Sequence, residues 1–262
     1  MLILYEYFKR GEFYGIKVYE VINTDIYYNL AFESYIFETI KKDDFSIIFY
    51  KNTDCLVIGK HQNLFLECNI NYTKENNIKI ARRESGGGTV FQDLGNLNYS
   101  FIGYLNLNDK EKNFNILMKS IKNFNISLTK DDKNSLFYNN LKVSGNAFRL
   151  SKNKFLHHGT LLLNTNLSKL NNSINIKNIN HNKKYIYSNY SKTTNLKDIS
   201  DDIDETNIKK QILINSKFYY GKIISYTLIE NNLNNYMSKK IKLLKNFNWI
   251  YNNSEKRGEI NV

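Results

Sequence analysis

Three consecutive glycines, Gly86, Gly87 and Gly88, are the strongest chemical feature of this 262-residue sequence. A backbone without Cβ atoms lets a ligand approach closely, and successive N–H groups can form a concave site for an anion. Arg82 and Arg83 stand just before them, and guanidinium donors suit a carboxylate or a phosphate. The residues that follow, Thr-Val-Phe, favour a strand. The pattern predicts a phosphate or acyl-phosphate site at the edge of a β-sheet.

Three glycines alone also suit a flexible hairpin turn, and neither the P-loop nor the dinucleotide-binding template fits them. Three further clusters favour the functional interpretation. Residues 57–63 read VIGKHQN, residues 141–149 read LKVSGNAFR, and residues 155–163 read FLHHGTLLL. Each joins an apolar stretch to a polar loop that contains glycine. Such units can be built along one sheet edge, so we expect the clusters to share a site.

Together these clusters resemble the lipoate–protein ligase family, in order and spacing, from about Glu20 to Ile250. Weaker matches occur at 29–33, 191–196 and 247–249. The resemblance implies an α/β (α+β) fold of mixed, largely antiparallel β-sheets flanked by helices, as in biotin/lipoate ligase-like catalytic domains. It predicts a catalytic domain at 1–250 and a polar tail at 251–262. The small accessory domain of longer ligases is expected to be absent here or to be a separate polypeptide.

The resemblance also implies a two-step reaction. Lipoate and ATP would give lipoyl-AMP, with Mg²⁺ neutralising the triphosphate, and the lipoyl group would then pass to a lysine of a lipoyl domain. The expected acceptors are lipoyl domains of 2-oxoacid dehydrogenase complexes or the glycine cleavage H protein.

Lys142 occupies the position of the essential lysine in this resemblance, where a compact ammonium can touch both the lipoate carboxylate and the α-phosphate. Arg83 is the second predicted contact to phosphate. The remaining residues of the predicted ATP and lipoyl-AMP site are Ser85, Gly86, Gly87, Gly88, Thr89, Val90 and Phe91. The predicted lipoate pocket contains Gln62, Asn146, Arg149 and His158. The metal ligands stay unassigned, because Ser135 stands where an acidic residue is expected.

The formal charge of +12 and the pI near 9.4 favour attraction of acidic proteins, such as lipoyl domains, or of nucleic acid. No nucleic-acid-binding motif occurs, so a nucleic-acid partner is not predicted. No apolar run reaches membrane-spanning length, so no membrane partner is predicted either. The N-terminus lacks the pattern of a signal peptide. We therefore expect a cytoplasmic protein, with an organelle matrix as the alternative.

The sequence contains only two cysteines, Cys55 and Cys68. A cysteine-dependent octanoyl or lipoyl amidotransferase of the same fold is the main alternative function, and it would use a thiol nucleophile without ATP. Both cysteines precede the glycine cluster, whereas the nucleophile is expected in the half that contains Lys142. A non-catalytic lipoate-binding module is the third alternative.

Hydrophobic periodicity predicts the elements that must position these residues. Helices are expected at 27–42, at 112–124 and within 206–245. Strands are expected at 13–22, 46–50, 56–59, 78–83, 88–91, 97–105, 126–129, 135–138, 141–150, 160–164 and 218–228. The polar segment at 168–195 is interpreted as a surface loop or as a lid over a bound adenylate.

Overall fold

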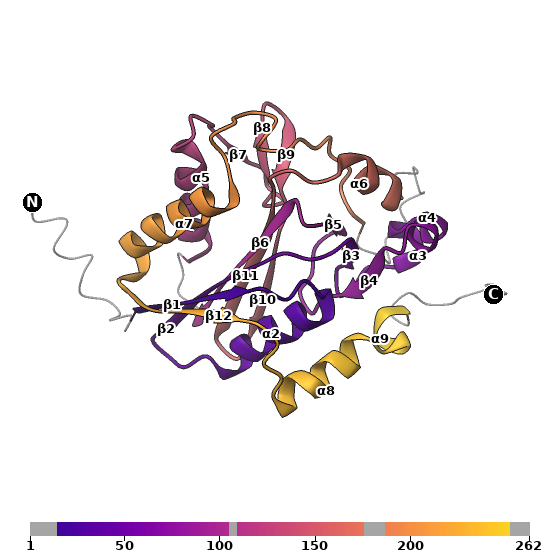
Figure 1. The fold of residues 1–262 in the computed structure, drawn as a ribbon, viewed down its shortest axis with the longest axis horizontal. Helices are drawn as coiled ribbons and strands as arrows, with labels where there is room; N and C mark the ends of the chain where they lie inside the picture. Colours follow the sequence, from indigo (N-terminus) through magenta and orange to yellow (C-terminus); the bar gives the residue numbers. More distant parts are fainter. Residues whose placement is uncertain (1–14, 105–108, 176–186, 252–262) are drawn as a thin grey trace, which may run out of the picture.

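A computed structural model describes residues 15–104, 109–175 and 187–251 of the chain. Its centre is a six-stranded mixed sheet with the order β10-β11-β6-β2-β1-β12 (Figure 1). β1 pairs in parallel with β2 and β12, and the remaining neighbours are antiparallel. The strands are β1 (Gly15–Val21), β2 (Asp44–Tyr50), β6 (Asn96–Tyr104), β10 (Asn146–Ser151), β11 (Lys154–Leu162) and β12 (Ile223–Ile229).

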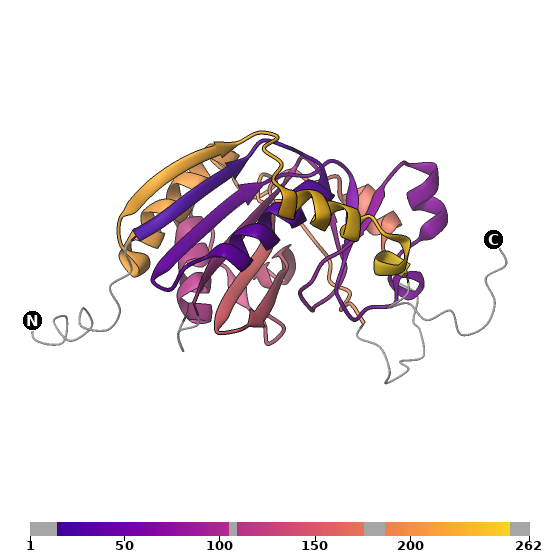
Figure 2. The same cartoon turned by 90° about the horizontal axis from the view of Figure 1, so that it is seen from below.

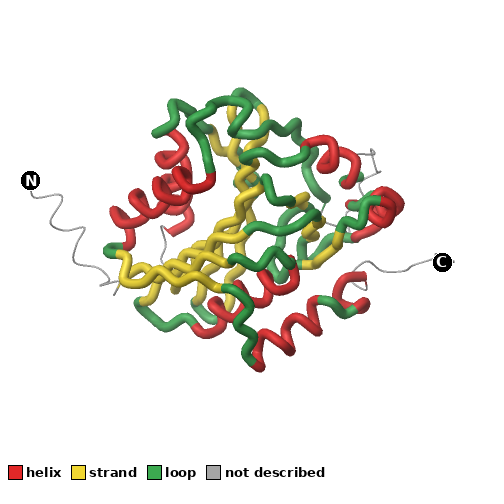
Figure 3. Tube along the Cα trace, in the orientation of Figure 1, coloured by secondary structure: helices red, strands yellow, loops and turns green. Residues whose placement is uncertain are grey.

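Helices cover both faces of this main sheet (Figure 3). Side chains of a strand point alternately to opposite faces. In β2, Phe45, Ile47 and Phe49 therefore pack toward α5 and α7, while Ile48 and Tyr50 pack toward α2 and α8. The helices are α5 (Asp109–Lys122), α7 (Glu205–Tyr220), α2 (Ile26–Thr39) and α8 (Asn235–Leu244). The main core thus lies between two helical layers.

A smaller sheet, β4-β3-β5, lies beside the main one (Figure 2). Its strands are β3 (Cys55–Ile58), β4 (Lys79–Arg82) and β5 (Val90–Gln92). The short helices α3 (Leu64–Glu67), α4 (Ile70–Glu75) and α9 (Phe247–Tyr251) adjoin it. Because β4 and β5 flank β3, the chain between them must cross the end of β3. That crossing is the glycine loop, residues 83–89.

A third sheet, β7-β8-β9, carries Lys142. It consists of β7 (Thr129–Lys130), β8 (Leu136–Tyr138) and β9 (Leu141–Ser144). The N–H of Lys142 donates to the carbonyl of Lys192 at 2.8 Å, and its carbonyl accepts from the N–H of Thr194 at 3.1 Å. Both backbone groups of Lys142 are therefore bonded to the segment 192–194, while β8 pairs along the other side of β9.

The predicted fold class is confirmed, and most predicted elements are present. The expected strand at 141–150 is interrupted at Gly145, which separates β9 from β10. The strand expected at 160–164 begins earlier, at Lys154, because it pairs along the whole of β6. Within 168–195, helix α6 (Leu167–Ser173) was not predicted, and the stretch 176–186 lies outside the described residues, as does 252–262 of the expected tail.

Two further differences have local causes. α7 extends to Tyr220, into the strand expected from 218, and stops at Gly221, which has a φ of 85°. Only Thr129 of the strand expected at 126–129 belongs to β7. No helix within the described ranges combines the length and the apolar character needed to span a bilayer.

Candidate functional site

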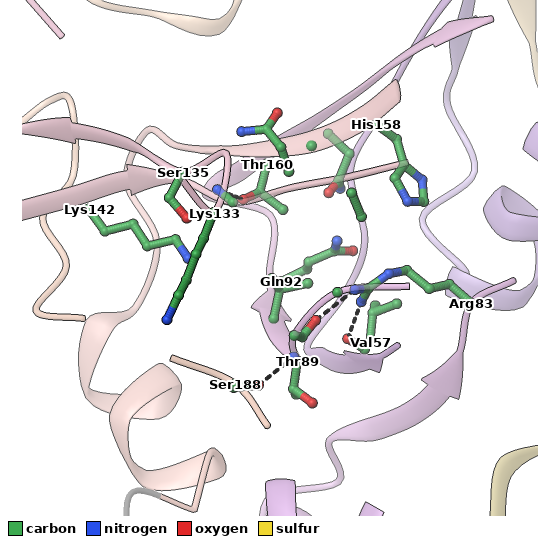
Figure 4. Close-up of a pocket in the computed structure, with 18 of the residues that line it drawn as sticks. Val57, Arg83, Thr89, Gln92, Lys133, Ser135, Lys142, His158, Thr160 and Ser188 are labelled. Atoms are coloured by element: carbon green, nitrogen blue, oxygen red, sulfur yellow. Dashed lines mark hydrogen bonds between the residues drawn. The ribbon is translucent and has the colours of Figure 1, made fainter. Parts of the chain in front are cut away.

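A cavity of about 340 Å³, called here the first cavity, lies between the glycine loop, the β9–β10 turn and β11. Figure 4 shows Arg83, Val57 and Thr89 on one side and Lys142, Lys133 and Ser135 on the other. Its polar lining includes Arg83, Gly87, Gly88, Thr89, Lys133, Lys142, Gly145, Asn146, His158 and Thr160. The predicted clusters at 82–98, 141–149 and 155–163 therefore do meet at one site.

The first cavity has a less polar end. Ile26 and Leu30 come from α2, Tyr50 from the end of β2 and Val57 from β3. All four side chains except that of Tyr50 are purely aliphatic. This end can hold a hydrocarbon chain, while the ammonium groups of Lys142 and Lys133 lie on the side opposite Val57 (Figure 4).

A second cavity, of about 500 Å³, adjoins the first. The two share Thr89, Val90, Lys133, Lys142, Gly145, Thr160 and residues 187–189 as lining. The second cavity adds Phe91, Leu162 and Leu170, which give it an apolar wall. Lys142 therefore stands at the junction of two connected spaces.

Arg83 braces the glycine loop from inside. It donates from Nε to Ser85 Oγ at 2.9 Å, and from Nη2 to the carbonyls of Gly86 at 2.6 Å and Gly88 at 2.7 Å. Nη1 donates to the carbonyl of Val57 at 2.9 Å. Burial lowers the pKa of Arg83 to about 10, with the charge of Glu33 acting in the opposite direction. The guanidinium thus fixes the loop in one shape.

The loop geometry requires glycine at two positions. Gly87 has a φ of +87°, a conformation that side chains rarely adopt. A Cβ at Gly59, in the neighbouring loop, would lie 2.1 Å from the carbonyl oxygen of Gly87. The two loops therefore touch backbone to backbone, which explains why a glycine follows β3 as well.

Arg82 has a different role from Arg83, although the two are adjacent. Its side chain is fully buried and points away from the cavity. Nη1 donates to the carbonyl of Gly59 at 2.9 Å, and Nη2 donates to the carbonyl of Ile250 at 2.7 Å. Trp249 Nε1 donates in return to the carbonyl of Arg82 at 2.8 Å. This arginine ties α9 to the small sheet.

His158 is part of a buried hydrogen-bonded chain. Its Nδ1 lies 2.8 Å from Glu33 Oε2, and its Nε2 lies 2.7 Å from Ser85 Oγ. Ser100 Oγ also donates to Glu33 Oε2, at 2.6 Å. Since Ser85 accepts from Arg83, the chain links α2 to the glycine loop. His158 lines the first cavity while its ring nitrogens are engaged.

Asn146 anchors the β9–β10 turn. Its Oδ1 accepts from Tyr99 and lies 2.8 Å from His157 Nε2, and its Nδ2 donates to the carbonyl of Asn134 at 2.9 Å. A Cβ at Gly159 would lie 2.5 Å from the same Oδ1. The bond to Asn134 connects the turn with the loop that carries Lys133.

Lys142 and Lys133 bring positive charge to the junction. No described side chain pairs with either ammonium group. Desolvation lowers the pKa of Lys142; the charge of Asp131 opposes this shift and that of Arg83 adds to it. An unpaired, partly desolvated ammonium gains strongly from an anion placed beside it. The site is therefore prepared to receive a negatively charged ligand.

Comparison with known proteins agrees with this geometry. The family described as "Lipoyl protein ligase A/B catalytic domain" matches residues 25–215. The chain belongs to this family. It is 32% identical over 205 residues to a lipoate–protein ligase A of Psychrobacter cryohalolentis, which covers 78% of this chain but 60% of that protein. This chain therefore matches less than two thirds of that relative's length.

Solved structures of the ligase family share the fold. LipL1 of P. falciparum in complex with lipoate superposes with a TM-score of 0.78 at 28% identity, covering 94% of this chain and 76% of that one. A lipoate–protein ligase A bound with ATP gives a TM-score of 0.74 at 18% identity, covering 92% and 98%. The second likeness shows the fold alone.

Not every predicted site residue of this ligase-family chain reaches a cavity. Gln62 is fully buried behind the glycine loop, where its Oε1 accepts from Thr89 Oγ1 at 2.9 Å. Arg149 forms ion pairs with Glu84 at 3.0 Å and Glu38 at 2.9 Å, away from both cavities. Ser85 and Gly86 contact Arg83 and do not line either space. Phe91 lines only the second cavity.

The sequence did not predict several lining residues. Lys133 lies two residues before Ser135, whose departure from the family resemblance was the available signal. The segment 187–189 lies at both cavities, and Ser188 Oγ accepts from the N–H of Thr89 at 2.7 Å. The polar composition of the segment 187–189 did not indicate this contact. Ile26 and Leu30 belong to a predicted helix, whose register against β3 no local pattern reveals.

Within the described ranges, no group of three or more His, Cys, Asp or Glu side chains could hold a metal ion. The residues do not form a dedicated cage, and Ser135 offers no carboxylate at its position. Cys55 and Cys68 are both buried, and burial raises the pKa of both thiols. Neither cysteine lines a cavity.

Proposed function

We propose that this chain activates lipoate with ATP and transfers the lipoyl group to a lysine of a lipoyl domain. The observation that carries the proposal is the unpaired Lys142 ammonium at the junction of a smaller, partly aliphatic cavity and a larger one. Lipoate is an apolar molecule with a carboxylate at one end, and ATP carries a triphosphate. The two substrates together therefore have this division of apolar and anionic parts. Family membership and a relative solved with lipoate support the choice of substrates.

In this proposal the lipoyl chain occupies the aliphatic end beside Ile26, Leu30 and Val57. Its carboxylate then lies near Lys142. The nucleotide occupies the second cavity, with Phe91 and Val90 against its apolar surface and the glycine loop beside its phosphates. A cation that touches both anions lowers their mutual repulsion, which is the main obstacle to bringing them together.

The first step forms the bond between a lipoate carboxylate oxygen and the α-phosphorus of ATP. The bond from that phosphorus to the pyrophosphate oxygen breaks, and pyrophosphate leaves with the electron pair. Lys142 stays protonated and stabilises negative charge on the α-phosphate and on the acyl oxygen. Lys133 supplies a second positive charge on the side of the leaving group. The braced loop with Gly87 keeps its position throughout, so little reorganisation is needed.

In the second step an acceptor lysine, as the free amine, attacks the acyl carbon. The bond from that carbon to the AMP oxygen breaks, the amine loses a proton, and an amide and AMP result. Lys142 again offsets charge, now on the departing phosphate. A formal charge of +12 would attract an acidic acceptor domain and raise its rate of association.

Mg²⁺ fits this site only as an ion carried by the triphosphate, because the described residues form no cage for it. When bound, it would neutralise phosphate charge and orient the leaving group. The acceptor proteins we propose are lipoyl domains of 2-oxoacid dehydrogenase complexes or the glycine cleavage H protein, and a separate accessory polypeptide is a further proposed partner. The cysteine mechanism receives no support from the two buried thiols.

The test is incubation of the chain with lipoate, ATP, Mg²⁺ and a lipoyl domain. We expect AMP and pyrophosphate in solution and one modified lysine on the acceptor, detected by intact mass. The Cys68→Ser variant should retain this activity. Acyl transfer from an octanoylated donor in the absence of ATP, lost in Cys68→Ser, would instead identify an amidotransferase. Lipoate binding without AMP release, even after a partner polypeptide is added, would identify a non-catalytic module.

A further inference from the structure

The outer edge of the main sheet is formed by β12. This strand is last in the sheet order and pairs on one side with β1. Figure 2 shows it along the rim of the sheet. In the part of the chain that the structure describes, no backbone hydrogen bond reaches its other side. Its outer N–H and C=O groups are therefore available to another strand.

β12 has little of the usual protection of an edge strand. Natural edge strands carry charges, prolines or bulges that discourage pairing. Residues 223–229 read IISYTLI and contain no charge or proline, and the irregularity in the ladder with β1 lies at the start of the strand, between Ile223 and Ser225. Ile224, Tyr226 and Leu228 are nevertheless 51%, 48% and 58% exposed. Such a strand is suited to bury itself against a partner.

The direction of the backbone groups selects a register. The carbonyl of Ile229 accepts from the N–H of Ile22, the residue after β1, so the groups of Ile229 face inward. Alternate residues of a strand direct these groups to opposite edges, so those of Leu228 and Tyr226 face outward. The alternation is interrupted between Ile223 and Ser225, where the ladder with β1 has a register shift and the carbonyl of Lys222 also faces β1. An incoming strand must therefore pair with Tyr226 and Leu228.

The residues around Tyr226 form a near-palindrome. We propose that two copies of this chain pair antiparallel through β12, with Tyr226 opposite Tyr226 of the second copy. This register brings Lys222 toward Glu230 at both ends, across the irregularity between Ile223 and Ser225. Both are exposed, and no described residue pairs with their charges. The other opposed pairs are Ile223 with Ile229, Ile224 with Leu228, and Ser225 with Thr227.

The chemistry of every opposed pair supports a second copy as the partner. Charge meets opposite charge, aliphatic meets aliphatic, and hydroxyl meets hydroxyl. The backbone groups of Tyr226 face outward and this residue lies opposite itself, so the central pair can exchange two N–H···O=C bonds. A two-fold axis makes such a self-complementary contact close on itself.

α7 extends the proposed interface on one face. Tyr226 lies opposite Val18 in the β1–β12 ladder, and Val18 shares a core with α7, so the two lie on the same face. Ile214 and Phe218 of α7, one turn apart, are 48% and 77% exposed. A two-fold axis perpendicular to the sheet puts both α7 helices on this face. Their exposed apolar side chains would then add to the buried area.

Disulfide capture tests the register directly. In Tyr226→Cys, the two self-opposed Cα atoms would be about 5.5 Å apart, which is within reach of a disulfide. We expect a covalent dimer under mild oxidation. In the matched control Ser225→Cys the self-distance is larger, because residue 225 lies opposite 227, and little dimer should form. The two native cysteines are buried and do not interfere.

Charge reversal provides an independent test by sedimentation over a concentration series. Lys222→Glu and Glu230→Lys should each weaken the dimer about tenfold, since like charges then meet at both ends. The double variant should restore the dimer, which also shows that the single variants fold. Lys197→Glu, which changes the net charge as Lys222→Glu does but elsewhere on the surface, should have no effect. A wild-type monomer at every concentration, or equal crosslinking of the two cysteine variants, would overturn the proposal.

Discussion

Arg83 and Lys142 face the first cavity from opposite sides, but their charged groups have different surroundings (Figure 4). The guanidinium of Arg83 donates to Ser85 and to three backbone carbonyls, including that of Gly88. The ammonium of Lys142 has no described partner. One side, residues 83–90, is a braced backbone, called here the glycine wall. The other, residues 133–146, presents free charge and is called the lysine wall.

Cations can therefore stabilise the fold on the glycine wall and remain available to bind a ligand on the lysine wall. A buried cation whose donors are occupied mainly preserves local shape. A desolvated cation without a partner reduces stability until an anion arrives. Substitutions on the glycine wall should therefore affect folding first, and substitutions on the lysine wall should affect activity first.

The largest effect is expected on the lysine wall, for Lys142→Met. Removing this ammonium should lower the rate of lipoyl-AMP formation by about 100- to 1,000-fold, the cost typical of losing one preorganised donor to a developing charge. The unfolding free energy should stay the same or rise, because a desolvation cost disappears. Pyrophosphate release and urea denaturation measure the two quantities. A large loss of stability with unchanged activity per folded molecule would reverse the assignment of the walls.

On the glycine wall, Arg83→Met removes the same charge and should have the opposite result. The carbonyls of Val57, Gly86 and Gly88 lose their donor while they remain partly buried. We expect the unfolding free energy to fall by about 3 kcal/mol. Urea denaturation beside Lys142→Met as the matched control decides the comparison. Equal stability of the two variants would show that the loop does not depend on Arg83.

Much of this arrangement could be predicted from the sequence, because apolar periodicity and glycine position are local. The strand–loop clusters around Gly87, Lys142 and His158 were recognisable and do meet. Their roles in the reaction stay predictions. The sequence could not predict that Arg82 binds α9 while Arg83 binds the glycine loop. This difference depends on which side of the small sheet α9 packs against.

Long-range contacts account for the remaining differences. Gln62 was expected in the lipoate pocket but supports Thr89 from behind, through a contact 27 positions away. Lys133 reaches the junction only because the β7–β8 hairpin and the bond from Asn146 to Asn134 fold its loop back. No local pattern contains either relation.

Lys133→Met tests whether the lysine wall works through more than one charge. Lys133 is exposed, so solvent screens its attraction for an anion, and we expect only about a fivefold loss of affinity for ATP. The exposed Lys197→Met is the control for net charge. Equilibrium binding of ATP measures both. A loss as large as that of Lys142→Met would mean that Lys133 is the principal cation.

The smallest effect is the pH dependence of stability. In the folded chain, burial lowers the pKa of Lys142 below its ordinary value of 10.5. The unfolded chain therefore binds the proton of this ammonium more tightly. The contribution of Lys142 to the unfolding free energy should therefore rise with pH, from the lowered pKa up to 10.5. The difference between wild type and Lys142→Met, measured by denaturation over this range, should show the rise. A flat difference would place Lys142 in solvent.

The central claim is that both walls hold one mixed anhydride. A double-mutant cycle tests it most directly, with Lys142→Met and Gly87→Ala and with the affinity of a non-hydrolysable lipoyl-adenylate analogue as the measured quantity. Groups that contact the same part of a ligand should be coupled, and we predict a coupling energy of at least about 1 kcal/mol. Losses that add within about 0.3 kcal/mol would mean that the two walls bind independently, and would contradict the account.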